Sequence, residues 1–317
     1  MLLRGITLAL LLGSSQGEEK IRLGLDQIHE MAQLTKVPSE FEPLDKLFYF
    51  MKQNNATSLE KRNEVGMTAL SVAASRGNFR YMEALLSNGA KVNAQDDRGR
   101  TALHWVFQQP HERKELKKRI DLLVNSGAHV AMRDKDGLTP MHMAVHTGHV
   151  AGIRILKRNR HSLEEQSPHG TPLHFAAMLG QWEAIRILAK AGANLEALHL
   201  GYPPMHCAAM TEQPAAIKAL AKVGANVDSK NDKGMTALHF SLGLGKLRSI
   251  RALIWAGADL DAEYNGLTVF EIAGTNKTLL KALSTPKDKS EKVEHNYLDE
   301  PSKKQASRTD KASKDEL

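Results

Sequence analysis

The chain has 317 residues, of which 42% are hydrophobic, 25% are charged and 5% are aromatic. This composition suits a folded protein, and the low aromatic content favours stacked helices over a β-sandwich or barrel. The formal net charge is only +7, which needs no nucleic-acid partner, and the single cysteine, Cys207, excludes an intramolecular disulfide framework.

The first 17 residues have the layout of a secretory signal peptide. Arg4 precedes the apolar run Ile6 to Leu12, and the small residues Ser15 and Gly17 stand before Glu18 as a cleavage site. The run is too short to span a bilayer, and no other stretch approaches 18 apolar residues. We therefore predict a cleaved leader at 1–17 and no membrane span.

Residues 18–62 are expected to form a helical N-terminal cap or a divergent repeat. Two apolar stripes at helical spacing support this, one in Ile21 to Leu34 and one in Leu44 to Met51. The segment also contains the sequon Asn55-Ala56-Thr57. A second sequon starts at Asn276, so Asn55 and Asn276 are predicted glycosylation sites.

A short motif then recurs seven times at nearly fixed spacing. Each copy opens with a glycine. In most copies Thr-Pro/Ala-Leu/Met-His comes after one intervening residue, and the better copies close with Gly-Ala. The openings start at Gly66, Gly99, Gly137, Gly170, Gly201, Gly234 and, in degraded form, Gly266. The closing glycines are Gly89, Gly127, Gly192, Gly224 and Gly257.

This arrangement resembles the ankyrin repeat over residues 63–283. The resemblance implies an all-α solenoid, in which each unit is a β-turn and two antiparallel helices. The residues fit that fold physically. An opening Gly suits a turn with positive φ, Thr suits an N-cap, Pro140 and Pro172 suit the first helical position, and the closing Gly suits a left-handed C-cap.

Four units besides the degraded seventh depart from the pattern. The second carries about five extra residues around Gln109 to Glu115. The third ends in Asn159-Arg160-His161 instead of Gly-Ala, so its junction with the fourth is expected to be distorted. The fifth has Pro203 in place of Thr, and the first has Ser71 in place of His.

The tail, residues 284–317, is rich in Lys, Ser, Asp and Glu, and we expect it to be disordered. It ends in Lys314, Asp315, Glu316 and Leu317, the address that the KDEL receptor reads to return proteins to the endoplasmic reticulum. Together with the leader, this predicts residence in the lumen of that organelle.

No catalytic, cofactor or metal site is expected. The repeat histidines, His104, His142, His174, His206 and His239, are a whole repeat apart, which does not suit one metal ion; the resemblance implies hydrogen bonds within their own turns. Cys207 is predicted to be a buried core thiol. The basic run Arg113 to Arg119, extended by Lys157, Arg158 and Arg160, is interpreted as a solvated face. The alternative is a site for an anionic ligand, or for nucleic acid if the protein is not lumenal.

The resemblance implies partner binding by the hairpin tips and first helices. The variable positions there form an apolar, methionine-bearing stripe, a composition that marks interaction sites. The candidate partner-binding residues are His146, Thr147, Met178, Leu179, His199, Leu200, Tyr202, Met210, Thr211, Met235 and Leu244. Partial burial against neighbouring repeats is the other interpretation of this stripe.

The sequence therefore predicts a non-enzymatic scaffold of the endoplasmic reticulum lumen that binds a protein or peptide. Two alternatives remain open, which are a cytosolic or nuclear ankyrin adaptor and a lumenal enzyme or enzyme accessory.

Overall fold

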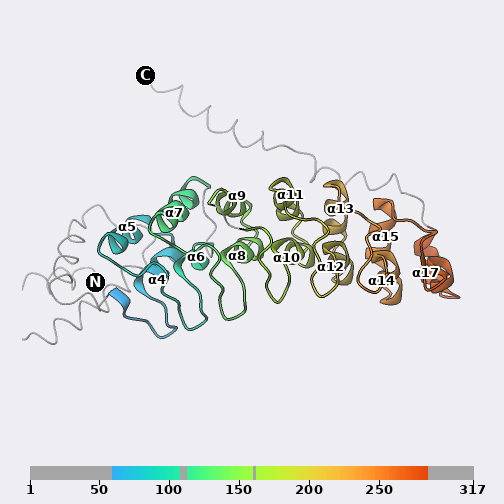
Figure 1. Ribbon diagram of the computed structural model, residues 1–317, viewed down its shortest axis with the longest axis horizontal. Helices are drawn as coiled ribbons and strands as arrows, with labels where there is room; N and C mark the ends of the chain where they lie inside the picture. The colour runs from blue at the N-terminus through green and yellow to red at the C-terminus, as the bar shows by residue number, and fades with distance from the viewer. Residues whose placement is uncertain (1–58, 108–112, 160–161, 285–317) are drawn as a thin grey trace, which may run out of the picture.

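The computed structural model describes residues 59–107, 113–159 and 162–284. These residues form fourteen helices in seven antiparallel pairs, stacked side by side into one elongated array (Figure 1). The first helices of the pairs form one row and the second helices form a parallel row. The connections that enter the repeats project as hairpins on the side opposite the second helices (Figure 1).

The helix bounds follow the repeat spacing. The first helices are α4 (Ala69–Arg76), α6 (Ala102–Trp105), α8 (Pro140–His146), α10 (Pro172–Met178), α12 (Pro204–Met210), α14 (Ala237–Gly243) and α16 (Val269–Ala273). The second helices are α5 (Phe79–Ser87), α7 (Arg113–Asn125), α9 (Val150–Arg158), α11 (Trp182–Lys190), α13 (Pro214–Lys222), α15 (Leu247–Ala256) and α17 (Lys277–Leu283). The last hairpin is a short antiparallel ladder, in which β1 (Glu263–Tyr264) pairs with β2 (Leu267–Thr268).

Helix ends form where the sequence places capping residues. The side chains of Thr68, Thr171, Thr236 and Thr268 accept a hydrogen bond from a backbone amide in the first turn of the helix that follows. Prolines occupy the first turn of α8 and α10, as expected. The closing glycines all have positive φ, between 89° and 94°, which ends the second helices in the left-handed region.

One continuous apolar core runs through the array between the two rows of helices. Small residues allow the helices of a repeat to approach closely. The pairs Ala73-Ala74, Ala176-Ala177 and Ala208-Ala209 are fully buried. The second helices contribute leucine and isoleucine from one face, including Leu85, Leu123 and Leu253. Because each pair buries its core against the next, each repeat depends on its neighbours for stability.

The repeat histidines join neighbouring repeats as well as capping their own helix. Nδ1 of His174 lies 2.8 Å from the hydroxyl of Thr171, and its Nε2 lies 3.1 Å from the carbonyl oxygen of Tyr202 in the next repeat. His104, His142 and His239 repeat this arrangement. A carbonyl oxygen only accepts hydrogen bonds, so Nε2 carries the proton and Nδ1 accepts. In these four repeats the expected bond within the turn is present, and a bond to the following repeat is added.

The fifth repeat lacks half of this arrangement. Pro203 offers neither an amide hydrogen nor a hydroxyl group, and among the described residues Nδ1 of His206 has no hydrogen-bond partner. Its Nε2 still lies 2.9 Å from the carbonyl oxygen of Met235. The helix α12 forms nevertheless, so the link between repeats is kept where the cap is lost.

Several predicted features fall outside the described residues. They are the leader, nearly all of the N-terminal cap including Asn55, part of the extra residues around Gln109 to Glu115, and the tail with Lys314 to Leu317. Of those extra residues, Arg113 to Glu115 begin α7. At the end of the third repeat, Asn159 stands where the first repeat has Asn88, and its side-chain amide likewise donates to a carbonyl oxygen one turn earlier, that of Ile155, at 3.0 Å. Arg160, which replaces the closing glycine, lies outside the described residues.

Candidate functional site

The tips of three consecutive hairpins pack against one another and form one wall of a groove. The amide of Lys135 donates to the carbonyl oxygen of Arg98 at 2.8 Å. A Cβ atom at Gly99 would lie 2.9 Å from the Lys135 nitrogen, and one at Gly137 would lie 2.6 Å from Cδ of Pro168. Both glycines also have positive φ, so the close approach of the tips depends on glycine at both positions.

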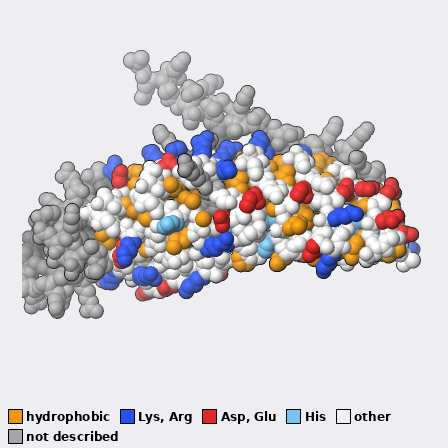
Figure 2. Space-filling model, in the orientation of Figure 1, with side chains coloured by type: hydrophobic (Ala, Val, Ile, Leu, Met, Phe, Trp, Pro, Cys, Tyr) orange, Lys and Arg blue, Asp and Glu red, His pale blue; other side chains and the backbone are white. Residues whose placement is uncertain are grey.

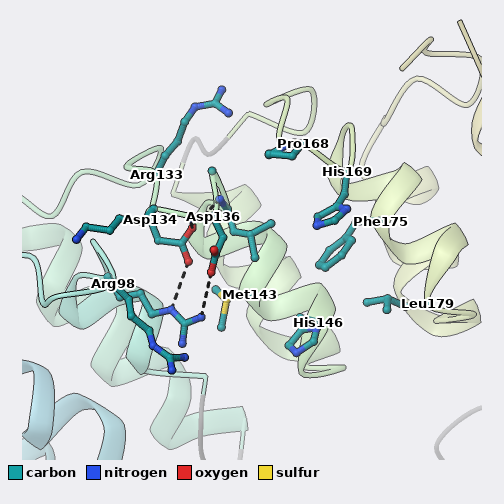
Figure 3. Close-up of a pocket in the computed structure, with 14 residues that line it drawn as sticks. Arg98, Arg133, Asp134, Asp136, Met143, His146, Pro168, His169, Phe175 and Leu179 are labelled. Atoms are coloured by element: carbon teal, nitrogen blue, oxygen red, sulfur yellow. Dashed lines mark hydrogen bonds and ion pairs between the residues drawn. The ribbon is translucent and has the colours of Figure 1, made fainter. Parts of the chain in front are cut away.

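The groove lies in the angle between these hairpin tips and the helices α8 and α10, and its volume is about 1000 Å³. Figure 3 shows its two unlike sides, with charged side chains from the second and third hairpins facing apolar and aromatic side chains from α8, α10 and the fourth hairpin. A cavity of this size accommodates several side chains of a ligand.

The charged wall contains four cations, Arg98, Arg100, Arg133 and Lys135. Arg100 is paired with the buried Asp134 at 3.3 Å and with Asp136 at 3.9 Å. Arg133 lies 3.1 Å from Glu165.

The apolar wall is a stack of rings. The ring of Phe175 lies between those of His169, 5.2 Å away and 16° from parallel, and His146, 6.0 Å away and 14° from parallel. Met143 and Leu179 continue the wall along α8 and past the end of α10 (Figure 3). Flat rings and flexible thioethers are adaptable surfaces for apolar ligands.

A row of exposed apolar side chains extends from this wall along the array. Leu179 and Met210 are each 38% exposed and Leu244 is 49% exposed, all at the ends of first helices. Other repeats fill the position of Leu179 and Leu244 with polar residues, namely Arg76, Thr147 and Thr211. Met210 stands one position earlier, where the first and third repeats have Ser75 and His146. The fold therefore accepts polar residues there, and the apolar character of the row is not required for packing.

The remaining predicted binding residues are divided between surface and core. Met178, Tyr202 and Met235 are half-buried, and Met178 and Tyr202 pack against the core. The hydroxyls of Thr147 and Thr211 donate to carbonyl oxygens one turn earlier in their own helices. The structure thus leaves Leu179, Met210 and Leu244 more accessible than Met178.

The hairpin tip before α12 is the most exposed part of the predicted stripe. Leu200 is 78% exposed and has a φ of 50°, a conformation that costs a leucine energy. Its neighbour His199 is half-buried, with Nε2 lying 3.1 Å from the carbonyl oxygen of Pro168.

The basic run on α7 is only partly a solvated face. Lys117 pairs with Asp121, and Lys118 pairs with Glu115 at 2.9 Å. Arg119, in contrast, is 3% exposed, at a position where later repeats have Ala184, Ala216 or Ser249. The expectation that the whole run is solvated was therefore wrong at Arg119. Figure 2 shows Lys and Arg side chains along the edge that the second helices form.

Sequence reasoning did not find the charged wall of the groove. Arg98, Arg133 and Lys135 come from hairpin tips of different repeats, and only the stacking brings them together. The signal available was that they stand one to four residues before an opening glycine, at positions where hairpin side chains face outward.

Other chemistry is sparse in the described part of the chain. It contains no cluster of three or more potential metal ligands. No helix within it is long and apolar enough to cross a membrane. Cys207 is buried, as predicted, and burial raises the pKa of its thiol to about 11.

Comparisons with known proteins agree with this architecture. The family described as Ankyrin repeats (3 copies) matches residues 39–116, 112–199 and 196–264. The ankyrin repeat domain of Bcl-3 superimposes with a TM-score of 0.59 and 25% identity, covering 69% of this chain and 100% of that one. The ankyrin repeat domain of human ASB11 superimposes with a TM-score of 0.54 and 24% identity over the same shares.

Among curated proteins, the chain is 31% identical over 98 residues to transient receptor potential cation channel subfamily A member 1 of Homo sapiens. It is 35% identical over 108 residues to Rabankyrin-5 of Mus musculus, and 31% identical over 112 residues to NF-kappa-B inhibitor zeta of Mus musculus. These matches cover 31%, 33% and 35% of this chain but only 9%, 9% and 15% of the relatives. The likeness is therefore to a part of each relative. The chain belongs to the ankyrin-repeat family.

Proposed function

We propose that this protein is a non-catalytic interaction module, which binds a segment of another protein along the face formed by the first helices and hairpin tips. The observation that carries the proposal is the row of Leu179, Met210 and Leu244, exposed at helix ends that other repeats fill with polar residues. Exposed apolar residues gathered on one face of a protein commonly mark an interaction site.

The groove supports the same proposal, because it adjoins the row at Leu179 and contains both apolar and charged groups. Protein interfaces combine an apolar centre with a polar rim, and aromatic, methionine and arginine side chains are enriched in them. Phe175, Met143 and Arg98 supply these three kinds of side chain within one depression.

Site-specific photocrosslinking in cells tests the proposal. A photoreactive phenylalanine analogue replaces Leu244 or Met210 on the proposed face, or Arg251 on the exposed side of α15 as a matched control. We expect discrete adducts with a partner protein from positions 244 and 210 and none from 251. Adducts from position 251 alone, or from no position, would contradict the proposal.

We also propose that this module acts in the lumen of the endoplasmic reticulum. The support is in the sequence alone, from the apolar run Ile6 to Leu12 and the retrieval motif Lys314 to Leu317. A cytosolic or nuclear adaptor remains the alternative, and one relative, 31% identical over 113 residues, is named as a nuclear factor.

Secretion and glycosylation assays distinguish the two compartments. Deleting residues 314–317 should send the protein into the medium if the KDEL receptor retains it. Glycosidase should reduce the mass of the wild-type protein, and this shift should be smaller after Asn55→Gln or Asn276→Gln. Recovery of both the full-length and the shortened chain in the cytosol would contradict the lumenal proposal.

A further inference from the structure

We propose that the groove between the hairpin tips and α8–α10 recognises a peptide segment in which an acidic residue stands next to an apolar or aromatic residue. This inference rests on the proposed function and names the chemistry of the partner. It follows from the two unlike walls of the groove and from the charges on one of them.

The charged wall has cations without an ion-pair partner among the described residues. Arg98 and Lys135 line the groove, are exposed, and form no ion pair with any residue that the structure describes. The two acids in the lining, Asp134 and Asp136, are both paired with Arg100. The lining therefore has a surplus of positive charge, which attracts a carboxylate and repels a basic segment.

These two cations are held in place by backbone contacts. The amide of Arg98 donates to the Asp96 carboxylate at 2.8 Å, and its carbonyl oxygen accepts from the amide of Lys135 at 2.8 Å. The residues thus protrude from two adjacent tips whose backbones are fixed to each other. Fixing the anchor points in advance reduces the entropy that a ligand must lose on binding.

The opposite, apolar wall favours a ligand with an apolar side chain next to its acidic residue. Phe175 is nearly buried between the rings of His146 and His169, and Met143 and Leu179 extend this surface. A ligand bearing only carboxylates would leave this wall in contact with water, and one bearing only apolar groups would leave the two cations unpaired. A segment with both groups in adjacent positions satisfies both walls.

A peptide-display selection on the folded, full-length chain tests the inference. The probe is a library of randomised linear peptides, followed by fluorescence anisotropy with the most enriched peptide. We expect the enriched sequences to contain Asp or Glu beside Phe, Trp, Leu or Met. The charge-reversed variant Arg98→Glu/Lys135→Glu should bind the enriched peptide at least about tenfold more weakly, and Leu179→Glu should also weaken binding.

Lys230→Glu/Lys233→Glu provides a matched control. Lys233 precedes Gly234 as Arg98 precedes Gly99, its amide donates to the side chain of Asn231, and the double variant changes the net charge equally. This control should keep its affinity within about twofold, as expected for charges distant from the ligand.

The outcomes separate this inference from the proposed function. Enrichment of peptides that lack acidic residues would overturn the acidic-ligand inference but not the proposed binding face. The same holds if the affinity of the enriched peptide is unchanged by Arg98→Glu/Lys135→Glu and falls with Leu179→Glu. If no peptide is enriched, or if the enriched peptide binds all of these variants as tightly as wild type, both the inference and the proposed function are contradicted.

Discussion

The fourth and fifth repeats have similar helix pairs but different buried hydrogen bonds. In the fourth, Nδ1 of His174 lies 2.8 Å from the hydroxyl of Thr171. In the fifth, Pro203 stands in place of the threonine and Nδ1 of His206 has no partner in the described structure. Both histidines keep the Nε2 bond to the following repeat, at 3.1 and 2.9 Å. The contact between repeats is thus the part of the arrangement that both retain.

Both repeats expose an apolar side chain at the end of the first helix, although not at the same position. The fourth exposes Leu179; the fifth has Thr211 at that position but exposes Met210, the equivalent of Met178. A buried polar group has lost its partner, whereas an exposed apolar group is present at the end of both helices. This contrast suggests that stability determines the buried positions and that binding determines the exposed ones.

The largest expected effect comes from the shared core. Leu173 and Met205 occupy equivalent, fully buried positions in the two repeats. Leu173→Ala should lower the free energy of unfolding by roughly 2–5 kcal/mol, and Met205→Ala should fall in the same range, because both leave a cavity. Urea denaturation measures the change, and the exposed Leu244→Ala should cost less than about 0.5 kcal/mol. Equal effects at buried and exposed sites would contradict this account.

Acid should destabilise the array through the histidines. Burial lowers the pKa of His174 from 6.5 to about 4, and it also lowers the pKa values of His104, His206 and His239. The pKa of His174 is lower in the folded than in the unfolded state. Its contribution to the free energy of unfolding is therefore fully present above pH 6.5 and is lost as the pH falls toward 4. For His174 the full loss corresponds to roughly 3 kcal/mol.

Denaturation at several pH values between 7 and 4 measures this loss. The variant His174→Gln should be less stable than wild type at pH 7 and should lose less further stability on acidification. If the variant and wild type show the same dependence on pH, His174 does not contribute to it.

Restoring the missing partner should stabilise the fifth repeat. Pro203→Thr supplies an amide hydrogen and a hydroxyl group to Nδ1 of His206, and the backbone there already has the φ of −67° and ψ of 162° that the capping threonines adopt. We expect a gain of about 1 kcal/mol in the free energy of unfolding. The reverse change, Thr171→Pro in the fourth repeat, should cost a similar amount. A loss of stability in Pro203→Thr would show that the proline has a packing role.

A smaller effect should follow at the hairpin between the two repeats. Leu200 has a φ of 50°, and the equivalent tip of the last hairpin has Asn265 at 53°. Because asparagine tolerates this conformation better than leucine, Leu200→Asn should raise stability by roughly 0.5–1 kcal/mol. Thermal unfolding measures it. No gain would mean that Leu200 makes compensating contacts in the folded protein.

The sequence predicts the repeated part of the structure well, because the repeat places Gly, Thr, Pro and Ala wherever the backbone or the packing demands them. The sequence predicts contacts less well where residues from different repeats meet only because the repeats stack. The bond from His174 to Tyr202 joins residues 28 positions apart. The groove brings Arg98 near Phe175 in the same way. The burial of Arg119 was not predictable in this way, because it depends on the space that neighbouring helices leave and not on the local sequence.

The central claim is that the exposed apolar row serves binding and not folding. The most direct measurement combines Leu179→Glu, Met210→Glu and Leu244→Glu in one chain and records both its melting temperature and its yield of photocrosslinked partner, with the photoreactive residue at position 235. We predict a melting temperature near that of wild type and loss of the crosslinked adduct. A variant that unfolds, or that folds and keeps its partner, would contradict the claim.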